Sequence, residues 1–445
     1  MKRMKTTRPN SWLLRAILLL MPLVAHAQAP TFLSLEQAVD RSAKHSAMVQ
    51  TAELDRKIAK SNRQQTDAIF LPQISLGYQA LFTNDPLNAF GFLLQQGQVS
   101  AADFDPNKLN NPGHAQDYAA SVEFQMPLLN VDKIFARKGA KLQEEMYKHK
   151  ADYTRDQVRF EVQKAYTQLQ FAYKAREILL VTLSDVKSIH ESVEQFHKQG
   201  LIQKSDVLNA KVQVNTIEAA LSKAESNIAN ASDGLRVLLG EELTADRAPY
   251  ETEPLQARVF VDADRQFSTF RSDLMAMEKA VKAYKTQTRS AAMAFVPSIN
   301  AFGNYMFHDD QVFRFNKDAY MVGISLKWKI FSGNMNRGKM RAASFEQQKM
   351  EKNYELFVNK SRSDVDRNRR TIVDLDFEIR KQKTSVSQAE EAFRIMSDRH
   401  KEGLVSTTNL LLAEAQLSQQ RLALAQAVMN HNIACFYQDI LTFTF

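Results

Sequence analysis

Apolar and polar residues alternate along four short segments of the chain, at residues 72–82, 117–128, 297–307 and 318–331. A period of two is that of a β-strand with one apolar and one polar face. Each segment is close to the roughly 9 to 11 residues that a strand needs to cross a bilayer, and aromatic residues lie toward the ends of the apolar face. We therefore predict membrane strands whose polar face lines a lumen. A half-buried sheet of a soluble domain is the alternative interpretation.

The segments between these strands have the apolar spacing of long helices. In the first half of the chain we predict an opening helix at 34–69, a long helix at about 133–198 and a return helix at about 205–239. The long helix would span roughly 100 Å at 1.5 Å per residue, far more than a globular helix. The two shorter helices are together about as long, so we expect them to lie end to end beside it.

The second half of the chain repeats this order of elements. The segment "KQGLIQKSDVLNAKVQ" around Gly200 matches "KEGLVSTTNLLLAEAQ" around Gly403. The sequence thus predicts two repeats, at 28–255 and 256–445, each made of a helix, two strands and a long helical hairpin. In the second repeat the helices are expected at about 272–294, 337–402 and 407–441, where the two shorter ones together fall short of the long one.

A proline marks the same corner in both repeats. Pro72 and Pro297 align within "AIFLPQISLGY" and "MAFVPSINAFGNY", where the opening helix of each repeat gives way to its first strand. Proline has no N–H to donate to a helix or a central strand, so it fits such a corner. The first repeat also has a longer loop between its strands, at about 83–116, rich in Asn, Asp, Gly and Pro as an exposed loop should be.

Four strands cannot close a membrane barrel. The smallest such barrels have about eight strands, and open sheet edges are excluded from lipid. Identical neighbours must therefore complete the wall. Three copies, which give 3 × 4 = 12 strands, are the simplest closed solution, so we predict a homotrimer of a mainly α-helical chain with a 12-stranded membrane β-barrel.

The N-terminus has the pattern of an export signal. Residues 1–27 contain five basic residues, an apolar stretch from Trp12 to Ala25 and a small-x-small cleavage site; an uncleaved anchor is the alternative. Removal of this signal peptide would lower the formal net charge from +8 to 8 − 5 = +3, which takes away the main support for nucleic-acid binding. The single cysteine, Cys435, excludes an internal disulfide framework.

The whole pattern resembles the TolC-like outer-membrane efflux proteins, the exit ducts of tripartite pumps and type I secretion systems. The most specific motifs are the two Gly-Leu turns followed by "SDVLNA" and "TNLLLA", and the resemblance covers essentially the whole chain after residue 27. It implies a trimer in the cell outer membrane, surrounded by lipid, whose barrel continues as a long α-helical coiled-coil barrel through the periplasm. It also implies a periplasmic adaptor and, through it, an inner-membrane transporter as partners.

In family members the hairpin turns meet the adaptor. By position, Gly200, Leu201, Gly403 and Leu404 would form this docking tip. Glycine tolerates the positive φ of a tight turn, and exposed leucines at a turn need cover. The alternative is that the two glycines merely end two helices.

The resemblance also implies a periplasmic gate held by polar contacts just past these turns. Asp206 matches such a position, and Asn409 is its counterpart in the second repeat. Leu412 stands where a further acid is found in the family, so we expect no strong cation-binding constriction. As an alternative, Asp206 is simply an acid favoured by the dipole at a helix N-terminus.

The sequence contains no catalytic constellation. The histidines form no HExxH motif, and no GxxxxGK[ST] motif is present. We therefore expect a protein that is not an enzyme, with no cofactor and no metal site. The terminal "LTFTF" resembles the last strand of many barrels, but in the family layout the C-terminus is periplasmic, so for Phe445 we favour the packing of a tail.

These observations favour a passive duct. Cargo from an inner-membrane transporter would leave through it once an adaptor opens the periplasmic tip. The alternative is a periplasmic coiled-coil adaptor or scaffold protein without a membrane barrel, which explains the helices but not the four alternating strands. The sequence does not determine whether the cargo is a drug, a metal ion, a peptide or a protein.

Overall fold

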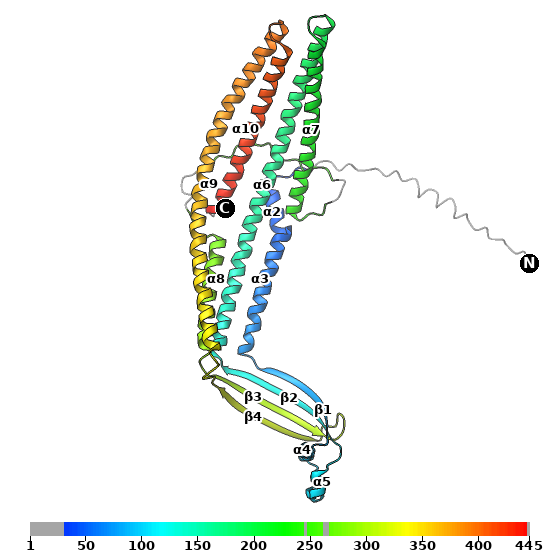
Figure 1. The fold of residues 1–445 in the computed structure, drawn as a ribbon, viewed down its shortest axis with the longest axis vertical. Coiled ribbons are helices and arrows are strands. Elements are labelled where there is room, and N and C mark those ends of the chain that lie inside the picture. The colour runs from blue at the N-terminus through cyan, green and yellow to red at the C-terminus, as the bar shows by residue number, and fades with distance from the viewer. Residues whose placement is uncertain (1–30, 244–246, 261–266, 443–445) are drawn as a thin grey trace, which may run out of the picture. The chain divides into compact units, whose positions relative to one another are not determined.

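The computed structural model describes residues 31–243, 247–260 and 267–442. The predicted signal peptide at 1–27 and the terminal Phe445 lie outside the described residues. The long helices and the four strands follow one another in the order that the sequence predicts. The two long hairpins are α6–α7 and α9–α10 (Figure 1). The elements are α2 (Leu35–His45), α3 (Ala47–Gln65), the 3-10 turn η2 (Thr66–Ile69), β1 (Gln73–Thr83), α4 (Pro86–Gln96), η3 (Ala101–Phe104), α5 (Pro106–Asn110), β2 (Ala115–Leu129), α6 (Val131–Lys198), α7 (Lys204–Leu239), α8 (Ser272–Met293), β3 (Ser298–Asp309), β4 (Lys317–Lys327), α9 (Met335–Lys401) and α10 (Thr407–Thr442).

The chain forms two compact units, described separately below. The first contains residues up to 41 together with 162–257 and 378–429, and the second contains 42–161, 258–377 and 430 onward. Helices α6, α9 and α10 contribute residues to both units. No helix in the described part of the chain combines the length and the apolar character needed to cross a membrane.

The second unit contains a four-stranded antiparallel sheet in the order β1-β2-β3-β4. Pro72 and Pro297 come directly before β1 and β3, where no ladder N–H is required of them. The two edge strands bury almost nothing within the chain, and their apolar side chains, such as Leu76 and Ile324, are largely exposed. To be stable, such a sheet needs an apolar environment or another protein that covers its apolar face, and neighbouring strands that pair with its two open edges.

The elements differ from the sequence prediction in three places. The opening helix is broken at Ser46, whose backbone is extended (φ −58°, ψ 127°) and whose side chain is buried between α2 and α3. The loop at 83–116 contains α4 and α5, each with an aspartate N-cap followed by proline, which are strong local helix signals. The fourth strand ends at Lys327, four residues before the predicted end.

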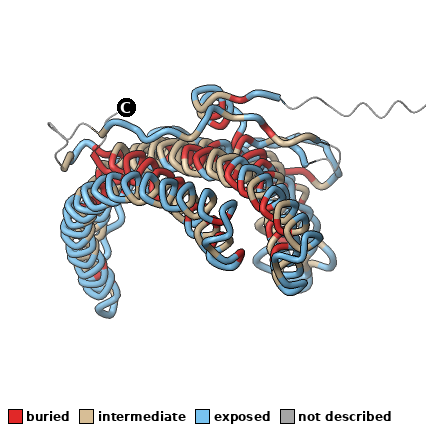
Figure 2. Tube along the Cα trace, turned by 90° about the horizontal axis from the view of Figure 1, so that it is seen from above, coloured by how far each residue is buried: buried red, intermediate tan, exposed pale blue. Residues whose placement is uncertain are grey.

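Among the described residues of the first unit, buried positions form stripes where neighbouring helices touch (Figure 2). One stripe joins α6 and α7 through Leu179, Val186, Val214 and Ile217. Another joins α9 to α10 through Ile379 and residues near Val428. Such stripes are what an apolar repeat on one helix face produces when helices pack in a coiled-coil manner. They leave the remaining helix faces polar and exposed.

Candidate functional site

The two hairpin turns have the same backbone structure. Each is a Schellman motif, in which the glycine N–H donates to the carbonyl of a histidine three residues back and the next N–H donates to a carbonyl five residues back. The N···O distances are 2.8 Å for Gly200 to His197 and 3.0 Å for Gly403 to His400. The glycines have φ of 75° and 71°, and a Cβ there would meet no atom within 4 Å. Glycine is therefore required by backbone conformation and not by lack of space.

A leucine follows each glycine and points away from the protein. Leu201 is 66% exposed and Leu404 is 75% exposed. In a Schellman motif the residue at this position often packs back on the last helical turn. Here both leucines are mostly exposed, so both turns offer apolar surface to water. Exposed apolar side chains at two equivalent turns are suited to contact with another protein.

A small core holds the two turns beside each other. Ile189 and Val193 of α6 pack with Leu410 of α10, so residues of both repeats share one buried cluster. The rings of Phe196 and His400 lie 5.8 Å apart between their centroids. The two turns therefore form one surface within the first unit, which the order of residues in the sequence alone does not reveal.

His400 and Thr407 are buried polar residues of this region. The Nε2 of His400 lies 3.3 Å from the hydroxyl oxygen of Thr407, at the start of the return helix α10. Burial lowers the pKa of His400, and the nearby carboxylate of Asp206 opposes this effect. Sequence reasoning missed His400. The repeat alignment could have found it, because His400 and His197 both stand three residues before their glycine.

The two predicted gate residues have different surroundings. Asp206 lies in the first turn of α7, is half-buried and faces His400 of the other hairpin. Asn409, in the first turn of α10, is exposed, and its backbone N–H donates to the Ser406 hydroxyl at 3.4 Å. Leu412 is also exposed. Asp206 thus interacts within its own chain, whereas Asn409 is free to face a neighbour.

A second polar feature is the carboxyl group of Glu414 in α10, which is only 1% exposed. Burial raises its pKa to about 7; the nearby carboxylate of Asp185 acts in the same direction, while Thr182 and Arg421 act against it. One carboxyl oxygen of Glu414 has no hydrogen-bond partner. A buried acid without full pairing is most stable when protonated.

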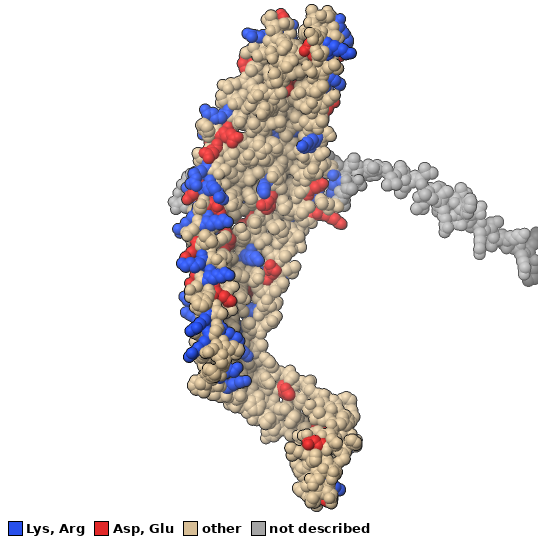
Figure 3. Space-filling view, in the orientation of Figure 1, with Lys and Arg blue, Asp and Glu red and all other residues tan. Residues whose placement is uncertain are grey.

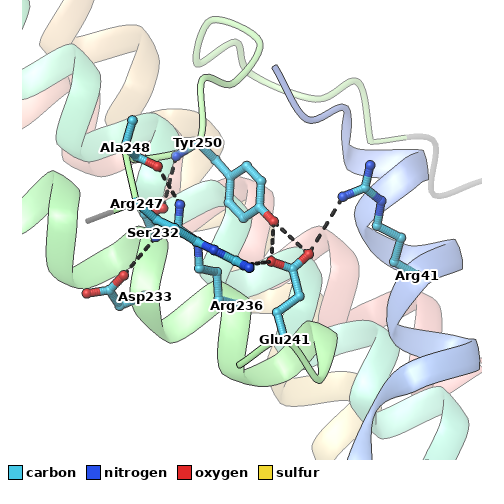
Figure 4. Close-up of polar contacts among 8 residues, drawn as sticks. All are labelled: Arg41, Ser232, Asp233, Arg236, Glu241, Arg247, Ala248 and Tyr250. Carbon is cyan, nitrogen blue, oxygen red and sulfur yellow. Dashed lines mark hydrogen bonds and ion pairs between the residues drawn. The ribbon is translucent and has the colours of Figure 1, made fainter. Parts of the chain in front are cut away.

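A cluster at the C-terminal end of α7 fixes the connection between the repeats (Figure 4). The Arg236 guanidinium donates to the Ala248 carbonyl, pairs with Asp233 at 2.9 Å and lies 4.8 Å from the centroid of the Tyr250 ring. The Tyr250 hydroxyl donates to the Glu241 carboxylate at 2.7 Å. Arg41 and Arg247 also form ion pairs with Glu241, at 3.7 and 3.4 Å. This cluster is structural, since each charged group is matched by another group of the same chain.

The described residues contain no group of three or more His, Cys, Asp or Glu side chains placed to hold a metal ion. The hairpin turns offer apolar contact and the first helical turns offer polar contact. Neither arrangement activates a nucleophile or a water molecule.

Comparison with known proteins agrees with this description. The sequence profile of the outer membrane efflux protein family matches residues 38–241 and 269–434. "Cation efflux system protein CusC" of Escherichia coli O157:H7 is 25% identical over 291 residues, which cover 64% of this chain and 62% of CusC. "Probable outer membrane lipoprotein SilC" of Salmonella typhimurium is 23% identical over 209 residues, 46% of this chain and 45% of SilC. The matched region thus spans less than two thirds of either relative.

The fold extends further than the sequence similarity. A crystal structure of CusC superposes with a TM-score of 0.79 over 93% of both chains, at 16% sequence identity. This likeness confirms the predicted fold class, a mainly helical chain with four antiparallel strands and long helical hairpins. The family match over most of the sequence confirms the resemblance to TolC-like proteins. The chain belongs to the outer membrane efflux protein family, whose members are efflux channels of the outer membrane and not enzymes.

Proposed function

We propose that this protein is the outer-membrane exit duct of a tripartite efflux pump or a type I secretion system. The observation that carries the proposal is the open four-stranded sheet, which has an uncovered apolar face and two unpaired edges. Three such sheets close into a 12-stranded barrel with lipid outside and polar side chains inside. The helical hairpins of the trimer continue this passage as a coiled-coil barrel in the periplasm.

The trimer is tested by separating membranes and running the protein unheated and heated on a gel. We expect the full chain in the outer-membrane fraction, with an unheated species of three times the chain mass that dissociates on heating. A soluble monomer would overturn the proposal. It would favour the alternative, a periplasmic adaptor or scaffold protein without a membrane barrel.

The docking tip for a periplasmic adaptor consists of Gly200, Leu201, Gly403 and Leu404. The support for it is that both leucines are exposed on turns of identical structure that share one buried cluster. An adaptor would cover this apolar surface and link the duct to an inner-membrane transporter. Contact at two equivalent turns per chain gives six contacts in a trimer, so individually weak contacts add up.

The docking tip is tested with a photo-crosslinking amino acid at Leu201 or Leu404 in living cells. We expect both positions to capture the same periplasmic protein. Leu356 is a matched control, because it is an exposed leucine on α9 far along the sequence from either turn. Capture at Leu356 alone, or at none of the three positions, would contradict the assignment.

The periplasmic gate is formed by Asp206 and Asn409 in the first turns of the return helices. The position of Asn409 on an exposed face supports contact across the trimer axis, and the charge of Asp206 lies near His400 of the other hairpin. Asp206→Ala should loosen the closed tip and raise the sensitivity of cells to antibiotics too large for ordinary porins. Unchanged sensitivity at wild-type protein levels would remove Asp206 from the gate.

The similarity to CusC, a protein described as part of a cation efflux system, nominates metal cations as the first cargo to test. A deletion strain should be challenged with a panel of metal salts and, in parallel, with a panel of drugs. Loss of metal resistance that the cloned gene restores would identify the cargo. Loss of drug resistance alone would exclude metal cations.

A further inference from the structure

The four junctions between strands and helices in the second unit share an unusual composition. Strands β1 and β3 begin, and strands β2 and β4 end, at the same end of the antiparallel sheet. All four junctions between strands and helices therefore lie at that end. Each carries exposed apolar side chains directly at the junction. These are Phe70, Leu71, Leu128, Leu129, Phe295, Val296, Trp328, Ile330 and Phe331.

The junctions hold one another in place. The Trp328 indole N–H donates to the Phe295 carbonyl at 3.0 Å, which joins the junctions of β3 and β4. The Arg137 guanidinium lies 5.6 Å from the centroid of the Phe70 ring, which joins the junctions of β1 and β2. The apolar side chains therefore form a fixed band and not a set of loose ends. Aromatic residues in such a band are typical of a membrane–water interface.

Basic residues without acidic partners follow this band at the junction of β4 and α9. No Asp or Glu occurs between Asp318 and Glu346. Five basic residues do occur there, all are exposed, and within the described residues none of them forms an ion pair: Lys327, Lys329, Arg337, Lys339 and Arg341. Lys and Arg side chains gather along the same stretch of α9 in Figure 3.

These charges do not serve the helix that carries three of them. The N-terminus of a helix has a partial positive charge, so basic residues there are unfavourable and acidic ones are preferred. The first turn of α9 contains no acidic residue. The helix N-terminus and the four cations from Lys329 to Arg341 instead add to a single positive field, which favours an anion and phosphate in particular. Lys327 does not belong to this group, because it lies within β4 two residues after Ser325, on the polar face that lines the lumen in the proposed barrel.

We propose that the segment Lys329–Arg341 binds the phosphate headgroups of anionic phospholipids in the leaflet of the outer membrane that faces the periplasm. This inference rests on the proposed function, because it requires the sheet to lie in the bilayer. The apolar side chains Ile330 and Phe331, each 79% exposed, would enter the acyl region. The basic side chains would reach the headgroups one or two helical turns away, with their stems along the apolar surface.

The test uses the purified full-length protein in neutral detergent, incubated with equal amounts of phosphatidylglycerol and phosphatidylcholine. Native mass spectrometry counts the lipids that each oligomer retains. The wild type should retain phosphatidylglycerol in preference to phosphatidylcholine. The triple variant Lys329→Gln, Arg337→Gln, Lys339→Gln should lose about a hundredfold in retention of phosphatidylglycerol, since each basic residue near a membrane surface contributes to the attraction.

Two control variants separate local recognition from net charge and from misfolding. Lys349→Gln, Lys352→Gln, Lys360→Gln removes the same charge from exposed positions further along α9 and should leave lipid retention unchanged. Lys329→Arg, Arg337→Lys, Lys339→Arg keeps the charge and should retain the preference. The proposal would be overturned if the wild type showed no preference for phosphatidylglycerol. It would also be overturned if the control variant at Lys349, Lys352 and Lys360 lost as much lipid retention as the test variant.

The proposed function fails by a different result. If the wild type forms no heat-sensitive trimer in the outer membrane, the duct itself is wrong. If the trimer forms but does not distinguish the two lipids, only the headgroup site is wrong.

Discussion

At the scale of single residues, Glu414 is an ionisable group in an almost fully buried position. Its carboxyl group is buried where α6 and α10 pack, facing Thr182 and Asp185 of α6 and Arg421 of its own helix. Because its folded pKa of about 7 is above its unfolded value of 4.5, the folded state binds more protons between these two pH values. Stability should therefore fall as pH rises through this window.

Glu414→Gln removes this dependence, because glutamine keeps the shape and stays neutral. At pH 4, below the unfolded pKa, the variant and the wild type should unfold at about the same temperature. At pH 8 the variant should be the more stable by up to about 3 kcal/mol. Thermal unfolding followed by circular dichroism at both pH values measures the difference. Parallel pH profiles for the two proteins would show that Glu414 is not the titrating group.

The turn glycines allow a test in which the same substitution has opposite effects. Gly403→Ala forces an alanine into the left-handed region and should cost about 1 to 2 kcal/mol. Gly234→Ala, in the exposed interior of α7, should stabilise by about 1 kcal/mol because alanine is the better helix former. Unfolding temperatures that move in opposite directions confirm the backbone argument, and a loss at both positions refutes it.

At the scale of elements, the cluster around Tyr250 decides how α7 ends and how the chain leaves it. Tyr250→Phe removes one hydrogen bond to the Glu241 carboxylate, which keeps its contacts with Arg41 and Arg247. We expect a loss of about 1 to 2 kcal/mol in stability, measured by chemical denaturation. Tyr284→Phe, a partly exposed tyrosine of α8, is the control and should have little effect. Equal losses in both variants would show that the effect does not come from the hydrogen bond to Glu241.

At the scale of the whole molecule, the orientation of the sheet can be read from two neighbouring positions of β4. Ile324 and Ser325 are both exposed in the single chain but lie on opposite faces of the strand. Ile324→Arg places a charge on the face assigned to lipid, at a cost of about 2 to 4 kcal/mol, and should reduce the yield of trimer in the outer membrane. Ser325→Arg lies on the face assigned to the lumen and should assemble. If both variants assemble equally well, the apolar face does not contact lipid.

The sequence by itself determined the local elements and their order. Strand alternation, long helical spacing and the matching turns at Gly200 and Gly403 are properties of short segments, and short segments carry their own conformational preferences. Sequence reasoning missed α4 and α5 because the composition of the loop outweighed the local N-cap signals. It missed the break at Ser46 because no glycine or proline marks the point at which the helix is interrupted. The number of strands also predicted that one chain provides only part of a barrel wall, since four strands cannot close a membrane barrel.

Only the tertiary structure decided which distant residues meet. It placed the charge of Asp206 near His400 and buried Glu414 against α6. It also placed four junctions that are far apart in sequence in one band at one end of the sheet. The physical reason is that burial and charge pairing depend on positions far apart in sequence, which no period of two or of 3.6 residues contains. A pattern states which face of a segment is apolar, while the packing of the chain decides what that face touches and whether a polar group within it finds a partner.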